Sequence, residues 1–164
     1  MLLPTDTIYG LHGLANDESA ERIAAIKGRD EGKRFVVIAS SIEQLQSFGA
    51  EIPSKLREIW PAPLTAVVRR KDSTLAARVP DLAWLRDLLE QTGPLISTSA
   101  NRSGELPIRT PRELPDDLRI AIDGIVDAGS REGKASAIVD FTGTEPILIR
   151  AGEQRFTQVL RKTP

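Results

Sequence analysis

The stretch Phe35-Val-Val-Ile-Ala-Ser-Ser-Ile-Glu-Gln44 joins a strand pattern directly to a helix pattern. Residues 35–39 form a continuous apolar run, which is typical of a strand that is buried on both faces. Ser41 and Gln44 have the spacing of a capping box and predict a helix that continues through Phe48. A buried strand that leads straight into a helix favours a fold in which the two alternate.

The same alternation extends outward from this stretch in both directions. We expect further helices over residues 17–27, 53–60 and 81–91, and further strands over residues 1–3, 64–70, 95–98, 125–127, 137–141 and 147–150. Asn16 is the predicted N-cap of the first helix and Gly28 its stop. We expect the Pro-rich segment 106–115 to form a surface loop. The pattern therefore predicts an α/β or α+β fold with a mixed sheet.

Composition bounds the chemistry that this chain can perform. It has 164 residues, no Cys and a single His, His12. We expect one domain over residues 1–164, without a disulfide framework, thiol nucleophile, zinc ribbon or multi-histidine metal site. No apolar run reaches the length of a membrane span and no signal peptide opens the sequence, so we expect a cytoplasmic protein without membrane contacts.

The charge is nearly balanced overall but uneven along the chain. There are 22 Lys and Arg residues against 23 Asp and Glu residues, which argues against a general binder of long polyanions. Residues 22–34, however, hold five cations and two acids. A local positive patch on a neutral chain suits a small anionic ligand.

The segment Pro4-Thr-Asp-Thr-Ile-Tyr-Gly10 combines small hydroxyls with an acid. In an extended conformation, Thr5 and Thr7 would face one way and Asp6 the other. Such hydroxyls beside a strand end could grip a small polar ligand. The alternative is a turn whose side chains satisfy their own backbone.

Lys27-Gly-Arg29 places two cations on either side of the expected helix stop. Beyond Gly28 an extended chain would let both side chains point the same way, and the resulting repulsion would be relieved by an anion between them. Phosphate fits this pair, because Arg offers a planar fork and Lys a point charge. The alternative is two solvated cations at a helix C-terminus.

Ser97-Thr-Ser-Ala-Asn101, followed by Ser103-Gly104, begins within an expected short strand. Ligands of α/β sheets bind at the carboxyl ends of strands, and this segment supplies uncharged hydrogen-bonding groups there. The alternative is a Ser- and Asn-rich turn. No Walker loop and no dinucleotide-binding glycine motif occurs anywhere in the chain.

Together these segments resemble the YrdC-type threonylcarbamoyl-AMP synthase family, in motifs that run in order over nearly the whole chain. The motifs are Pro4-Thr-Asp-Thr-Ile-Tyr-Gly-Leu11, Lys27-Gly-Arg29, Trp60-Pro-Ala-Pro-Leu-Thr65, Arg78-Val-Pro80, Ser97-Thr-Ser-Ala-Asn-Arg-Ser-Gly104, Ser136-Ala-Ile-Val-Asp140 and Arg150-Ala-Gly152. The resemblance implies a twisted, open mixed sheet with flanking helices and a concave basic cavity. It also implies a shortened first strand and no C-terminal extension like that of the longer members.

The family's reaction condenses L-threonine, bicarbonate or CO2, and ATP, and it releases pyrophosphate. Its product serves the N6-threonylcarbamoyladenosine (t6A) modification of tRNA, so the resemblance implies tRNA or proteins of that pathway as partners. The implied catalytic residues are Lys27, Arg29, Ser99 and Asn101. The implied threonine contacts are Thr5, Tyr9, Ser97 and Ser136. The implied ATP contacts are the four catalytic residues with Lys33, Thr65 and Arg150, and Mg²⁺ is expected to accompany ATP, held mainly by phosphates and water.

Three positions depart from the family pattern. Arg34 stands where Pro is common, Ala62 replaces the usual Gly, and Ala137 replaces a Thr whose hydroxyl we expect to bond phosphate. These departures keep a related enzyme that acts through carbamoyl-AMP as an alternative. A second alternative, from another class, is a non-catalytic module that binds double-stranded RNA or tRNA through the same concave face.

Overall fold

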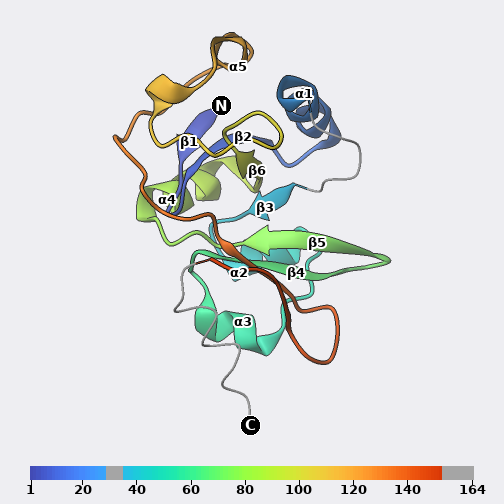
Figure 1. The fold of residues 1–164 in the computed structure, drawn as a ribbon. Helices are drawn as coiled ribbons and strands as arrows, with labels where there is room; N and C mark the ends of the chain where they lie inside the picture. The colour runs from blue at the N-terminus through green and yellow to red at the C-terminus, as the bar shows by residue number, and fades with distance from the viewer. Residues whose placement is uncertain (29–34, 153–164) are drawn as a thin grey trace.

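The computed structural model describes residues 1–28 and 35–152, and within them one mixed sheet of eight strands in the order β1-β2-β6-β3-β5-β4-β7-β8. The strands are β1 (Leu2–Pro4), β2 (Tyr9–Leu14), β3 (Val36–Ile38), β4 (Leu64–Arg70), β5 (Ser73–Arg78), β6 (Leu95–Ser99), β7 (Ala137–Asp140) and β8 (Ile147–Arg150). The pairs β3–β5 and β4–β7 are parallel and the others antiparallel. Figure 1 shows β1, β2 and β6 in the upper part of the molecule, β5 and β4 in the lower part, and β3 between them. The expected open mixed sheet is thus confirmed.

The first two helices begin at the N-caps that the sequence predicts, whereas the others have no side-chain cap. They are α1 (Asp17–Lys27), α2 (Ile42–Ser47), α3 (Ser54–Ile59), α4 (Ala83–Thr92) and α5 (Asp116–Ile120), and the 3-10 turn η1 (Pro111–Glu113) lies in the expected surface loop. Asn16 caps α1 by accepting from the Ser19 backbone N–H at 2.9 Å, and Gly28 ends it with a φ of 56°. No helix among the described residues has the length and apolar character needed to cross a membrane.

The capping box of α2 differs from the expected pattern in one bond. The Ser41 hydroxyl accepts from the Gln44 N–H at 3.1 Å, as predicted. The Gln44 side chain, however, accepts from the N–H of Ser40 at 2.9 Å, one residue before the N-cap. The bond from Ser40 to the Gln44 side chain therefore links the segment that follows β3 to the first turn of the helix.

The strands β2 and β5 and the short helix α5 were not predicted from the sequence, and one expected strand is shorter than predicted. β2 contains two glycines and a histidine, and β5 is rich in small residues, so neither shows a strong strand pattern. Both are specified by the neighbours that pair with them on either side. The strand expected over 125–127 is only a single bridge between Leu2 and Ile125.

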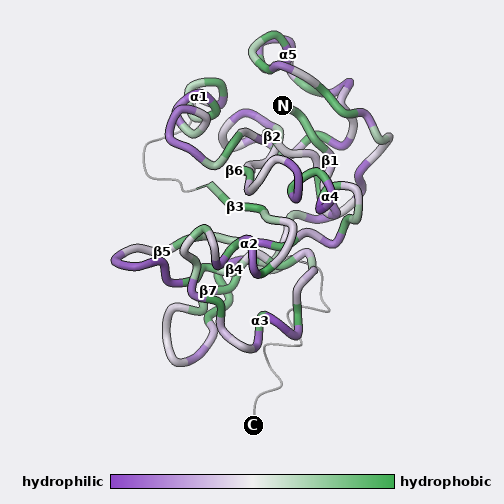
Figure 2. The backbone as a smooth tube through the Cα atoms, turned by 180° about the vertical axis from the view of Figure 1, so that it is seen from behind, coloured by the Kyte–Doolittle hydropathy of each residue, from purple (hydrophilic) through white to green (hydrophobic). Residues whose placement is uncertain are grey.

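The two faces of the sheet are covered by different helices. Along the strands, Val37 and Ile96 belong to the main apolar core, whereas the adjacent Ile38 and Leu95 belong to a second cluster, as alternation requires. The main core takes buried side chains from α1, α2, α3 and α5, namely Ile23, Leu45, Leu56 and Leu118. The second cluster is completed by α4. In Figure 2 the short strands β1 and β3 are hydrophobic and the β4–β5 turn is hydrophilic.

Strand pairing aligns side chains of several strands on the face that carries α4. Paired residues project to the same side of a sheet. The pairs on this face are His12 with Ser97, Ser97 with Val36, Ile38 with Arg78, Thr65 with Ile138, and Ile138 with Arg150. Ala77 pairs with Ala66 on the opposite face, so the neighbouring Arg78 and Thr65 return to this one. The part of this face that α4 leaves open forms the floor of a cavity.

Candidate functional site

A cavity of about 510 Å³ lies on this face, within the range typical of small-molecule sites. Its wall contains every predicted site residue that the structure describes: Thr5, Tyr9, Lys27, Thr65, Ser97, Ser99, Asn101, Ser136 and Arg150. The fold thus brings together residues that span most of the sequence. Arg29, Lys33 and Arg34 lie outside the described residues.

Lys27 reaches from the end of α1 to the turn that follows β6. Its buried ammonium donates to the carbonyl of Ser99, to the carbonyl of Asn101 at 2.8 Å, and to Oδ1 of Asn101 at 3.0 Å. The same Oδ1 accepts from the Ser99 hydroxyl at 2.6 Å, and the Asn101 amide donates to the Glu105 carbonyl at 2.5 Å. Lys27 therefore holds the 99–101 turn in shape, in addition to bringing positive charge to the cavity wall.

Thr5 organises the turn between β1 and β2, which also lines the cavity. Its hydroxyl donates to the Ile8 carbonyl at 2.8 Å and accepts from the N–H groups of Thr7 and Ile8 at 3.1 and 3.2 Å. The Thr5 and Thr7 hydroxyls lie 2.9 Å apart, so both face the same way, as expected. The segment is nevertheless a bend rather than an extended strand, and its hydroxyl bonds to its own backbone, as the turn alternative predicted.

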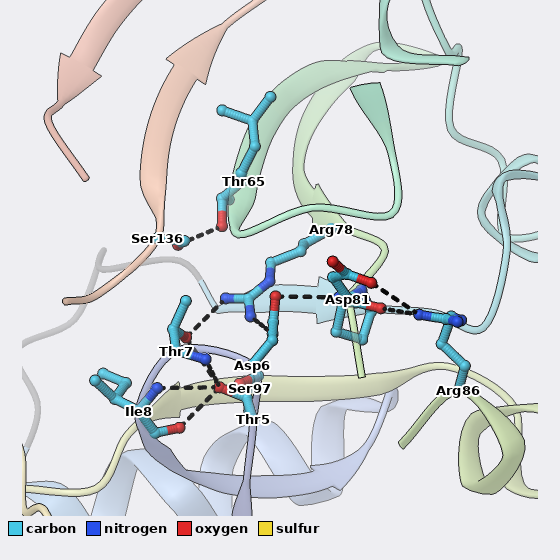
Figure 3. A network of polar contacts seen from close by, with 12 residues as sticks. Thr5, Asp6, Thr7, Ile8, Thr65, Arg78, Asp81, Arg86, Ser97 and Ser136 are labelled. Carbon is cyan, nitrogen blue, oxygen red and sulfur yellow. Dashed lines mark hydrogen bonds and ion pairs between the residues drawn. The ribbon is translucent and has the colours of Figure 1, made fainter. Parts of the chain in front are cut away.

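A buried ion pair that was not predicted from the sequence lies at the cavity wall. Asp6 and Thr7 both accept from the guanidinium of Arg78, Thr7 from Nη1 at 3.2 Å and Asp6 from Nη2, so the two side chains do not face opposite ways as expected (Figure 3). The second oxygen of Asp6 accepts from the Asp81 N–H at 3.1 Å. The side chains of Arg78 and Asp6 are only 7% and 6% exposed. Both residues stood in motifs that the sequence already singled out, because Arg78 belongs to one of the family motifs and Asp6 to another. What the sequence could not show is that the two side chains meet.

Arg78 and Arg150 concentrate positive charge on the wall. Burial lowers the pKa of Arg78 to about 9, and the nearby Arg150 adds to the lowering, yet the guanidinium stays protonated at neutral pH. Among the described residues, Nε of Arg78 is buried without a hydrogen-bond partner. Arg150 donates to the Ser136 carbonyl at 2.8 Å, and the Ser136 hydroxyl bonds that of Thr65 at 2.8 Å. Two cations beside a hydroxyl pair make this end of the cavity suited to an anion.

The charge on the described wall is strongly one-sided. Lys27, Arg78 and Arg150 are its cations, and Glu105 is its single acidic residue. The expected concave basic cavity is therefore confirmed for the described residues. They include no cluster of three His, Cys, Asp or Glu side chains that could hold a metal ion.

Ala137 plays no part in this wall. Its side chain is fully buried in the main apolar core, because it alternates with Ser136 and Ile138 and faces the opposite side of the sheet. The expectation that this departure removes a phosphate contact is therefore wrong. Ala62 is likewise buried in the core.

Tyr9 lies with its ring fully buried and its hydroxyl bonded to a neighbouring loop. The hydroxyl donates to the Gly129 carbonyl at 2.8 Å and accepts from the Ala128 N–H at 3.0 Å. Both bonds tie the loop that leads to Ser136 against the cavity floor. The expected contact between Tyr9 and threonine stays a prediction, and the observed bonds give Tyr9 a positioning role.

The buried His12 predicts a stability loss in mild acid. Burial lowers its pKa from 6.5 to about 4. Between these values only the unfolded chain binds the proton, so stability falls as the pH drops, by about 2 kcal/mol at pH 5 relative to neutral pH. Urea unfolding of the wild-type protein and of His12→Phe over this range measures the effect. Parallel pH curves for the two proteins would contradict it.

The comparisons with known proteins agree with this geometry. A family model for the Sua5/YciO/YrdC domain, described as "Telomere recombination", matches residues 1–152. The chain belongs to this family. A threonylcarbamoyl-AMP synthase of Pyrococcus abyssi is 32% identical over 91% of this chain and 49% of its own length. A threonylcarbamoyl-AMP synthase of Neisseria gonorrhoeae is 38% identical over 68% of this chain and 68% of its own length.

A solved Sua5/YciO/YrdC-family structure has the same fold. It is the crystal structure of P. abyssi Sua5 complexed with L-threonine, which is 30% identical with a TM-score of 0.86. The match covers 95% of this chain and 52% of that protein. The present chain thus spans about half the length of its P. abyssi relative.

Proposed function

We propose that this chain is an ATP-dependent nucleotidyltransferase that makes L-threonylcarbamoyladenylate from L-threonine, bicarbonate and ATP. The observation that carries the proposal is the cavity itself. It combines Lys27 at the 99–101 turn, Arg78 and Arg150 at the other end, and a hydroxyl-rich wall between them. Its relatives from P. abyssi and N. gonorrhoeae are named threonylcarbamoyl-AMP synthases, which supports the same activity.

The reaction needs charge compensation and alignment more than it needs a nucleophilic side chain. The amine of threonine reacts with bicarbonate to give a carbamate and water. A carbamate oxygen then attacks the α-phosphorus of ATP, the new P–O bond forms, and the bond to pyrophosphate breaks. Both reactants are anionic, so cations on the wall bring them together and stabilise the charge of the transition state. The absence of Cys from the sequence is compatible with this chemistry.

We assign the phosphates and the carbamate to the Lys27 side of the cavity. Ser99 and Asn101 complete that group. By family resemblance, Arg29 is expected to act with these residues and Lys33 to contact the nucleotide. Thr65 and Arg150 are assigned to the nucleotide, and Thr5, Ser97 and Ser136 to the amino acid. Arg78 is an addition to this set, because its buried guanidinium lines the wall beside Arg150.

Mg²⁺ enters this scheme as part of the MgATP substrate. The single carboxylate on the described wall, Glu105, cannot form a protein cage for the ion. Mg²⁺ keeps several waters and is usually bound through substrate phosphates, and this wall suits that mode. We further propose that the reaction takes place in the cytoplasm, within a single domain, and that the product passes to the proteins that modify tRNA.

Pyrophosphate release from ATP tests the proposal directly. Release is expected to require both L-threonine and bicarbonate, and omission of either should reduce it to the background rate. Mass spectrometry should detect threonylcarbamoyl-AMP in the complete mixture. Release that is indifferent to threonine would reject the substrate assignment.

A further inference from the structure

The ring of His12 lies beside the cavity wall with both nitrogens engaged. Nδ1 lies 2.9 Å from the carbonyl oxygen of Gly10, and Nε2 lies 3.1 Å from the hydroxyl oxygen of Ser97. His12 is 2% exposed, and it pairs with Ser97 across strands β2 and β6. Gly10 and Ser97 line the cavity, whereas the ring itself is hidden behind them.

These two contacts determine where the imidazole proton lies. A carbonyl oxygen can only accept, so Nδ1 must carry the proton that it shares with Gly10. In a neutral ring Nε2 then has a lone pair and must accept, which makes the Ser97 hydroxyl the donor. The low pKa of the buried ring, about 4, keeps it neutral at physiological pH.

As a consequence, the Ser97 hydroxyl can act toward the cavity only as a hydrogen-bond acceptor. Its single hydroxyl proton is directed to His12, so only its oxygen lone pairs remain for a ligand. An oxygen that offers lone pairs attracts an ammonium or hydroxyl group and repels the oxygens of phosphate or carboxylate.

We propose that His12 is a positioning residue that makes Ser97 a hydrogen-bond acceptor for the ammonium or hydroxyl group of the amino-acid substrate. The ligand assignment rests on the proposed function, but the polarity of Ser97 does not. Gly10 is required for this arrangement of His12 and Ser97, because a Cβ at position 10 would lie 2.7 Å from Cε1 of His12 and displace the ring. The backbone carbonyl that anchors Nδ1 therefore comes from a residue that leaves room for the imidazole.

Nitrogen-15 NMR of the untagged protein tests the polarity. The chain contains a single His, so its imidazole signals need no assignment. At neutral pH we expect a pyrrole-type Nδ1 and a pyridine-type Nε2, and we expect the Nε2 signal to move in Ser97→Ala. An Nε2-protonated ring, or an imidazolium, would overturn the proposal whether or not the protein is an enzyme.

Binding of L-threonine tests the role of the pair. We expect Ser97→Ala and His12→Phe each to weaken L-threonine binding by about 10-fold in calorimetric titrations, with ATP binding unchanged. Because His12 acts through Ser97, the double variant should bind no more weakly than Ser97→Ala alone. Leu88→Ala, which loosens the packing of α4, is the control for a general loss of stability and should bind threonine normally.

The binding and NMR results distinguish a failure of the His12 proposal from a failure of the proposed function. Additive losses in the double variant, or loss of ATP binding instead of threonine binding, would overturn the role of His12. Wild-type protein that binds no L-threonine would reject the proposed function and the ligand assignment together. The NMR result on the unliganded protein would still decide the polarity of Ser97.

Discussion

Lys27→Met is expected to reduce threonine-dependent pyrophosphate release by about 100- to 1,000-fold, the range found when one positioned donor is removed from a transition-state site. Methionine keeps the length of the side chain but removes its charge. The carbonyls of Ser99 and Asn101 and the Asn101 side chain then lose a buried donor that they share. The 99–101 turn should relax, so both charge and geometry are lost at once.

Stability must be measured beside turnover, because Lys27 is a structural residue as well. The Ser99 carbonyl and the Asn101 side chain keep other donors, the Asn101 N–H and the Ser99 hydroxyl. The loss therefore falls mainly on the Asn101 carbonyl and should cost about 1–3 kcal/mol, which urea unfolding can measure. Lys71→Met, in the exposed β4–β5 turn, is the matched control and should change neither quantity. A folded Lys27→Met protein with wild-type turnover would refute the assignment of this side of the cavity.

Asp6→Ala is expected to lower the free energy of unfolding by about 3–5 kcal/mol, because it leaves the buried guanidinium of Arg78 without its counter-charge. The N–H of Asp81 loses its acceptor in the same variant. A loss of this size is a large part of the stability of an ordinary domain. Urea unfolding followed by circular dichroism measures it.

A second variant distinguishes the cost of an unpaired buried charge from the cost of lost side-chain packing. Asp6→Ala combined with Arg78→Met should be more stable than Asp6→Ala alone, because no uncompensated charge remains. Asp117→Ala breaks an ion pair with Arg102 whose side chains are about half exposed, so it should cost about 1 kcal/mol or less. Equal effects of Asp6→Ala and Asp117→Ala would show that burial does not govern the Asp6–Arg78 pair.

Strands and helices with strong local sequence patterns were predicted, and those with weak patterns were not. The apolar run at 35–39 predicted β3, and the leucine spacing after Asp81 predicted α4, because both patterns match the periods of these elements. β2 and β5 carry weak patterns and became strands because the sheet on both sides offers them partners. The 125–127 segment had the better local pattern but found only one bridge.

The residues of the site were identifiable as types, but their contacts were not. Motif order brought Lys27, Ser99 and Asn101 into one hypothesis, although Lys27 and Ser99 are 72 positions apart in the chain. It did not show that Lys27 bonds the backbone of the 99–101 turn, or that Asp6 pairs with Arg78 at the cavity wall. Those contacts depend on strand register and helix placement, which no local pattern records.

The amino-acid sequence alone determined the α/β class, the caps of α1 and α2, and the family, because each is expressed in short segments whose chemistry acts locally. Tertiary structure alone decided which polar groups are paired and which face the cavity. The sequence shows that residue 97 is a serine, but it does not show whether the hydroxyl donates or accepts a hydrogen bond. That direction is set by His12 on the neighbouring strand and by the Gly10 carbonyl that bonds the His12 ring. A hydroxyl can donate or accept equally well, so only its surroundings in the folded chain select between the two.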